Sequence, residues 1–305
     1  MWFKNILIFR FTKPFDLSPE DLSKQLEAAA FTPCGSQDLQ RRGWVPPMGN
    51  LGTDFVHSTN GYTMLCLKRQ EKIIPSAAVN DILGDKIQQI EEAEGRSVGR
   101  KERKSLKDEV MFSMLPRAFT RSSLLYAYIA PQDGLLIINT PSNTRANELF
   151  TELRNVIGAL PIVPIKANSP PQQAMTHWLK TRVEPDSFEF GHECLLRDTL
   201  EEKALIHCKF QELCSEQINQ HLKESTYVTK LALISKQGVE FMIDENLAIK
   251  RLVYGDIIEE KANESDGLDA AEQFDIDFSI MTLELKGLIE SVMKAFSVPE
   301  NLGSE

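Results

Sequence analysis

Two helical patterns follow one another in the first half of the chain, and they constrain the fold more than any other feature. Residues 76–94 place apolar side chains at helical spacing, and Gly95 favours the left-handed turn that ends many helices. A second pattern covers about 100–115, and Pro116 breaks it. Segments typical of strands flank the pair, at 61–70 and 122–130. The sequence therefore predicts a helical pair between two strands, without regular strand–helix–strand alternation.

The rest of the chain is predicted to be a mixture of short helices and strands. Residues 2–11 have apolar side chains at both odd and even positions, which is typical of a strand buried on both faces. Ser18 and Pro19 match an N-cap and a first helical residue, so a helix is expected to run to about Ala30. Residues 33–52 are rich in proline and glycine and predict an ordered loop. Further helices are expected at 142–157, 172–181 and about 278–296, and further strands at 134–140, 160–164, 204–209, 226–235, 239–243 and 247–254.

These elements predict an α+β fold with mixed helices and antiparallel sheets. The segment 131–134, Pro-Gln-Asp-Gly, is a hairpin signal between two of the expected strands. Pro170 and Pro171 mark the expected boundary between two regions. The N-terminal α+β region, 1–168, contains a basic helical segment, and the C-terminal α+β region covers 169–305.

The composition predicts a soluble cytoplasmic protein. The five cysteines are odd in number and widely spaced, without a C-x-x-C pair, as expected for reduced thiols. The apolar N-terminus is too short and too interrupted for a signal peptide, and no run of 18 apolar residues could span a membrane. No phosphate-binding loop, dinucleotide fingerprint or nucleophile elbow occurs in the chain. We therefore predict no enzymatic activity and no cofactor.

The net charge of −10, with a pI of about 5.2, argues by itself against a nucleic-acid partner, but the charge is segregated. Six of the twelve residues 96–107 are basic and one is acidic. On a helix, four of the six share one face, which suits a rod-like polyanion such as DNA. A solvated helix face is the alternative interpretation. The candidate DNA-binding residues are Arg96, Arg100, Lys101, Arg103, Lys104 and Lys107, with Arg117 and Arg121 shortly beyond.

Residues 256–277 form the opposite segment, with nine acids against Lys261 alone. A solvated connector before the last helix is the simplest interpretation, and acidic outer faces would direct DNA toward the basic one. Asp275 and Asp277 could instead form a metal pair, which would make the chain a nuclease. The histidines and cysteines at 192–214 match no compact zinc motif, so no metal site is predicted.

Six blocks of sequence resemble one family of bacterial proteins, the recombination-associated RdgC family. They are ordered along the chain from its first residues onward, and their agreement is too long to arise by chance. The blocks are Trp2-Phe3-Lys4-Asn5, residues 31–37, residues 43–49, residues 105–110, Leu115-Pro116-Arg117-Ala118-Phe119 and residues 228–233.

The resemblance implies a cytoplasmic, nucleoid-associated protein that binds double- and single-stranded DNA with little sequence preference. It also implies a homodimer closed into a ring, with DNA in a basic hole, that limits filament formation by the recombinase. Phe119 matches a ring-closing contact, although burial in the core is the alternative for this side chain. Lys209 matches one of two paired basic positions in the family, and Phe210 replaces the second, which puts DNA contact there in doubt. A regulator that acts directly on the recombinase, with weak DNA binding, is the other hypothesis.

Overall fold

The computed structural model describes residues 2–199, 204–224, 226–255 and 269–299. Within these residues the fold is α+β, as predicted, and is built on one twelve-stranded antiparallel sheet. The strand order is β2-β4-β5-β6-β1-β12-β11-β10-β8-β9, with β3 paired to β4 and β7 paired to β1.

The strands are β1 (Asn5–Phe11), β2 (Gln40–Val45), β3 (Val56–Thr59), β4 (Tyr62–Ile73), β5 (Phe119–Ala130), β6 (Leu135–Ile138), β7 (Ile162–Pro164), β8 (Phe188–Asp198), β9 (Leu205–Lys209), β10 (Thr226–Ser235), β11 (Glu240–Asp244) and β12 (Ile249–Val253). The helices are α1 (Pro19–Ala28), α2 (Ser76–Glu94), α3 (Arg100–Met114), α4 (Asn143–Ile157), α5 (Pro171–Thr181), α6 (Glu216–Glu224) and α8 (Ala270–Ala295), and a 3-10 turn, η2, covers Leu115–Arg117.

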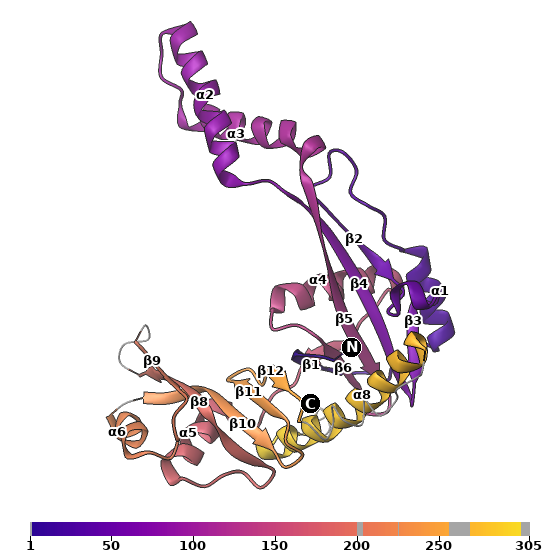
Figure 1. The fold of residues 1–305 in the computed structure, drawn as a ribbon, viewed down its shortest axis with the longest axis vertical. Coiled ribbons are helices and arrows are strands. Elements are labelled where there is room, and N and C mark those ends of the chain that lie inside the picture. Colours follow the sequence, from indigo (N-terminus) through magenta and orange to yellow (C-terminus); the bar gives the residue numbers. More distant parts are fainter. Residues whose placement is uncertain (1, 200–203, 225, 256–268, 300–305) are drawn as a thin grey trace.

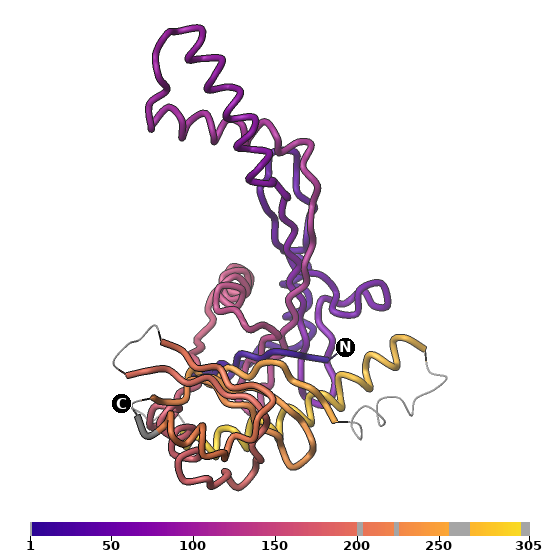
Figure 2. The backbone as a smooth tube through the Cα atoms, turned by 60° about the vertical axis from the view of Figure 1, so that its left-hand side comes forward, coloured from indigo at the N-terminus to yellow at the C-terminus, as the bar shows by residue number. Residues whose placement is uncertain are grey.

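The subunit has the shape of a crescent (Figure 1). Its lower part, which we call the body, contains β1, β6, β8 to β12, α5, α6 and α8. The long strands β4 and β5, flanked by β2, leave the body as an arm, and the helical pair α2–α3, which we call the tip, ends that arm. Figure 2 shows the same arrangement from another side, with the arm as a narrow stalk between body and tip.

Strand β1 lies near the middle of the sheet because both of its faces are apolar. It pairs with β6 through Ile8 and Ile137, and with β12 through Ile6 and Ile249. Successive side chains of a strand point to opposite faces. Ile6 and Ile8 accordingly join the core under α8, whereas Leu7 joins the core under α1 and α4. The prediction of a strand buried on both faces is confirmed.

Several local signals act as predicted. Ser18 caps α1, and its Oγ accepts a hydrogen bond from the backbone N–H of Asp21 at 3.1 Å. Gly95 ends α2 in the left-handed conformation, with φ of 64°, which a residue without a Cβ adopts at little cost. The hairpin signal joins β5 to β6, with Gly134 at φ of 62°. The division of the chain at residue 168 stays a prediction.

Other predictions were wrong. The segment 33–52 is ordered and buries Trp44, as predicted, but it is not a loop throughout, because residues 40–45 form β2 and pair with β4. The last helix begins at Ala270, eight residues before the expected start, since Asp269 and Glu272 form a capping box there. Strand β8 and helix α6 were not predicted, because polar residues interrupt the apolar pattern of both.

Candidate nucleic-acid interface

The tip is held together by few contacts of its own. Helix α2 buries Val79 and Leu83, and α3 buries Val110. An ion pair between Lys86 Nζ and Glu109 Oε1, at 2.9 Å, joins the two helices directly. The arm supplies the remaining support, because β4 and β5 pair without interruption from Thr63 and Ile129 to their outer ends. The tip is therefore a small module presented far from the body (Figure 1).

The basic segment forms the first two turns of α3, and its side chains are exposed. Gly99 precedes the helix, and the cationic residues follow at once. Within the described residues, none of the five cations on α3 has a carboxylate partner within ion-pair distance. They are Arg100, Lys101, Arg103, Lys104 and Lys107. Exposed, unpaired cations at helical spacing are free to exchange condensed counterions of a nucleic acid.

The two helices of the tip carry opposite charge. Residues 76–94, which form α2, contain five acids and one cation, whereas the basic residues concentrate from 96 to 107. This partition leaves one side of the tip attractive to a polyanion and the other repulsive. The tip thus presents its cations on the α3 side only, whereas a surface with evenly mixed charges would present no preferred side to a polyanion.

Arg96 and Arg121 differ from the cations of α3, because acids already hold them. Arg96 contacts Glu94 at 2.7 Å and Glu102 at 2.8 Å, and the guanidinium lowers the pKa of the Glu102 carboxyl. Arg121 pairs with Glu71, which lies directly opposite on β4. A contact of either arginine with phosphate would have to compete with these carboxylates. Their predicted role in DNA binding stays a prediction, and it is weaker than that of the α3 cations.

Phe119 lies where the arm meets the tip, and it is 85% exposed. It is therefore not part of the core of the subunit. Its cross-strand neighbour Ile73 is 45% exposed, and Phe112 on α3 is 57% exposed. Arg117 is exposed in the turn η2 just before this strand. Exposed apolar side chains that pair across two strands, such as Ile73 and Phe119, are typical of a surface that a partner covers. The part of Phe119 in ring closure stays a prediction.

Lys209 is the last residue of β9, a strand of the body that lies across the concavity from the tip. It faces Glu193 across the strand pair β8–β9. Phe210, which follows it, is 95% exposed and has φ of 52°. The fold does not bring Lys209 close to the basic segment of α3. Within one subunit the predicted DNA-binding residues therefore lie in two separate parts, the arm with its tip and the body, and α4 lies in the concavity between these parts (Figure 1).

A cluster of arginines where the arm passes α4 was missed by sequence reasoning. Arg42 on β2, Arg69 on β4 and Arg145 on α4 all contact Glu148, at 3.2, 3.0 and 3.3 Å. The Glu148 carboxyl is 11% exposed, and it ties three elements together. These arginines are distant in sequence, so no charge run reveals them. The adjacent pair Arg41-Arg42 on a strand was the one local signal.

The acids that were considered for metal binding have other partners. Asp275 lies 3.0 Å from Nε2 of His57, whose ring packs edge-on against Phe274 and Phe278. Asp277 accepts a hydrogen bond from the side chain of Gln273. Among the described residues no group of three or more His, Cys, Asp or Glu side chains is arranged to hold a metal ion. The acidic residues from 256 to 268 lie outside the described residues.

The cysteines are free thiols, as predicted for all five. Cys194 and Cys208 are buried and face each other across β8 and β9, and burial raises the pKa of Cys194. His207 points elsewhere and contacts Glu193 at 2.6 Å. No helix among the described residues is long and apolar enough to cross a lipid bilayer.

The fold and the site define an α+β protein with an exposed basic helix on a long β arm. A family model described as "Putative exonuclease, RdgC" matches residues 1–298. The chain is 40% identical over 300 residues to the recombination-associated protein RdgC of Aeromonas hydrophila, which covers 98% of this chain and 99% of that protein. The RdgC proteins of Psychromonas ingrahamii and Tolumonas auensis are 39% and 38% identical, over 99% and 97% of this chain and 100% and 98% of theirs. The chain belongs to the RdgC family of recombination-associated proteins.

Proposed function

We propose that this protein binds double- and single-stranded DNA without sequence preference, as a homodimeric ring that encircles it. The observation that carries the proposal is the exposed, unpaired cationic start of α3 at the end of the arm. Phosphate contacts of this kind provide affinity but read no bases. Occupation of the DNA by the ring would limit filament formation by the recombinase. In a cell such a protein would work in the cytoplasm, associated with the nucleoid.

The shape of the subunit supports closure by two-fold symmetry. A crescent has two horns, and a two-fold axis through a dimer brings identical surfaces together at each of them. Phe119 and its exposed neighbour Ile73 lie where the arm meets the tip, and Phe210, directly after β9 in the body, is exposed as well. Both interfaces of such a dimer would be self-complementary. The acids of the chain would then face outward, while the α3 cations and the concavity around α4 face the DNA.

The test is retention on DNA that has no ends. The full-length protein is loaded on a covalently closed plasmid and challenged with high salt, and the same plasmid, linearised, serves as the matched control. A ring stays on the circle and slides off the linear form. Cleavage of the loaded circle by a restriction enzyme should then release the protein. Equal release from both forms before cleavage would rule out encirclement and leave an open electrostatic surface.

A direct contact with the recombinase is the competing explanation for an effect on recombination. Capture of the recombinase by the protein after nuclease treatment would support that contact, because no DNA would remain to bridge the two. Inhibition that disappears when DNA is in excess over this protein, with no capture, would support occupation of the DNA. Both measurements use the same full-length chain.

The description of the family model motivates one more activity to test, degradation of DNA from its ends. End-labelled duplex and single-stranded DNA are incubated with the protein in Mg²⁺ and in Mn²⁺. We expect the label to stay in full-length DNA. Release of labelled nucleotides in proportion to protein, lost on Asp275→Asn, would identify a nuclease instead.

A further inference from the structure

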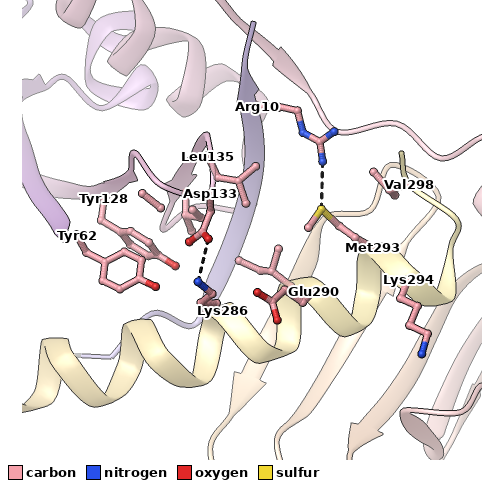
Figure 3. Close-up of a pocket in the computed structure, with 13 residues that line it drawn as sticks. Arg10, Tyr62, Tyr128, Asp133, Leu135, Lys286, Glu290, Met293, Lys294 and Val298 are labelled. Atoms are coloured by element: carbon pink, nitrogen blue, oxygen red, sulfur yellow. Dashed lines mark hydrogen bonds and ion pairs between the residues drawn. The ribbon is translucent and has the colours of Figure 1, made fainter. Parts of the chain in front are cut away.

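A cavity of about 570 Å³ separates α8 from the root of the arm, and the proposed DNA-binding surface does not include it. Tyr62 of β4 and Tyr128 of β5 form one wall, and Lys286 and Met293 of α8 form the opposite one (Figure 3). Volumes of a few hundred cubic ångströms are typical of sites for small molecules. The cavity opens to solvent beside the exposed residues Glu290 and Lys294.

Hydrogen-bond donors gather at one end of the cavity. Figure 3 shows the hydroxyls of Tyr62 and Tyr128 pointing toward the ion pair of Lys286 and Asp133, whose atoms Nζ and Oδ1 are 2.9 Å apart. An ammonium group has three donors, and this contact uses one of them. Burial and Asp133 raise the pKa of Tyr62, so its hydroxyl is a protonated donor at neutral pH.

Tyr128 directs a hydrogen-bond donor into the cavity. Its side chain is 1% exposed, yet no described residue of the chain forms a hydrogen bond with its hydroxyl. Burial raises the pKa of Tyr128 well above 10, so the hydroxyl keeps its proton. A hydroxyl at the wall of a cavity can donate a hydrogen bond to a molecule inside the cavity. The hydroxyl of Tyr128 faces the cavity next to Lys286 and Tyr62.

The walls and the charges narrow the class of ligand. Leu135, Ile137 and Ile289 line the middle of the cavity and suit an apolar body. The charged lining groups are the cations Arg10, Lys286 and Lys294 and the acids Asp133 and Glu290, an excess of one positive charge. A single excess charge suits a monoanion, whereas a phosphate dianion would need more.

We propose that this cavity binds a small organic monoanion with an apolar body, of which a medium-chain carboxylate is the simplest member. The carboxylate accepts hydrogen bonds from the hydroxyls of Tyr62 and Tyr128 and from the ammonium of Lys286. The hydrocarbon lies along the apolar wall toward Met293. The site joins the root of the arm to α8 and does not depend on DNA binding.

Titration of the full-length protein with octanoate tests the proposal, with 1-octanol and octylammonium as matched probes. Calorimetry gives the affinity, and NMR of the methionine methyl groups, with the Met293 signal assigned by Met293→Leu, gives the place. We expect octanoate to bind with a Kd of roughly 1 mM or tighter and to shift the Met293 signal. Octylammonium should bind at least about tenfold more weakly, because its charge matches that of Lys286.

The variant Tyr128→Phe removes the hydroxyl and keeps the ring. We expect it to weaken octanoate binding about tenfold while leaving octanol binding unchanged, because one charge-assisted hydrogen bond is lost. Tyr227→Phe, on β10 outside the cavity, is the matched control and should leave both affinities unchanged. If Tyr128→Phe does not fold, Lys286→Gln makes the same test of the ammonium. No saturable shift of Met293, or equal binding of octanoate and octylammonium, would mean that the cavity holds only water.

Discussion

The tip and the body are built from the same kinds of element, but they are stabilised differently. Helix α8 of the body buries seven side chains, whereas α2 and α3 together bury three. The buried set of α8 is Phe278, Met281, Thr282, Leu285, Leu288, Ile289 and Val292. Burial of apolar area dominates folding energy, so the body stabilises the subunit. The tip is left with exposed charges and exposed aromatics, and a surface of that kind is available for partners.

The largest effect is expected from removal of charge at the tip. Counterion release contributes roughly 1 kcal/mol for each neutralised phosphate near 0.1 M salt, so replacing four cations of α3 by Gln weakens DNA binding up to about a thousandfold. The slope of log affinity against log salt should fall by up to about four. Filter binding over a range of salt measures both. The substitutions are Arg100→Gln, Arg103→Gln, Lys104→Gln and Lys107→Gln.

The matched control removes the same charge from exposed sites elsewhere, through Lys13→Gln, Lys166→Gln, Lys180→Gln and Lys236→Gln. A weak effect is expected from this set, since none of it belongs to the proposed interface. If the two quadruple variants weaken binding equally, overall charge matters and the tip has no special part. Melting temperatures should stay close to that of the parent chain in both.

The next largest effect is expected when Leu→Ala is made once in the body and once in the tip, and it is a difference in the free energy of unfolding. Leu231→Ala empties a site in the core of the body, where the parent side chain is fully buried, and is expected to reduce the free energy of unfolding by about 2–5 kcal/mol. Leu83→Ala in α2 should change it by less than about 1 kcal/mol, because the tip opens locally. Urea unfolding followed by tryptophan fluorescence reports on the body and arm, since Trp2, Trp44 and Trp178 all lie outside the tip.

Hydrogen exchange separates local from global opening in that pair of variants. Leu83→Ala should speed exchange over 76–114 alone. A loss of global stability equal to that of Leu231→Ala would show that tip and body unfold as one unit. The contrast between the two regions would then be wrong.

The same contrast explains which parts of the fold the sequence predicts. Local signals were sufficient for the tip, because Gly95 and the helical spacing on both sides of it lie within forty residues. They failed for β2, whose paired residues in β4 lie 21 to 31 positions further along the chain and whose Gly43 packs against the backbone of Phe31. They failed for β8, because polar residues interrupt its apolar pattern and the strand is defined by its pairing with β9 and β10.

The candidate site divides in the same way. The cations of α3 could be predicted because they are neighbours in sequence and share one helical segment. The exposure of Phe119 was predicted from the family resemblance, whereas the burial of β5 follows no alternation, since its first six residues are exposed and most of the others are buried. The arginines around Glu148 come from three separate elements, so their proximity depends on the whole fold.

A smaller effect is expected from Phe119, and it concerns assembly. Phe119→Ala should leave the melting temperature of the subunit unchanged, because the ring is 85% exposed. Retention on closed circular DNA should fall several-fold while the initial salt-dependent binding persists. Sedimentation and the plasmid challenge measure the two effects. Leu283→Ala, at an exposed site of α8, is the control that should leave retention intact. Loss of folding in Phe119→Ala would contradict an exposed role for this side chain.

The smallest effect is expected from lowering the pH, and it concerns the outer end of the arm. The hydrogen bond from Arg121, directly opposite on β5, holds the pKa of Glu71 below its ordinary value of 4.5. A carboxyl whose pKa is lowered in the folded state contributes stability above its unfolded pKa and loses it as pH falls through the folded value. The outer ends of β4 and β5 should therefore open more readily below about pH 4.5, whereas their inner ends keep their protection. Hydrogen exchange at matched intrinsic rates measures this gradient, and Glu71→Gln should abolish its pH dependence. If the variant keeps the same dependence, a carboxyl other than Glu71 controls the opening of the outer ends of β4 and β5.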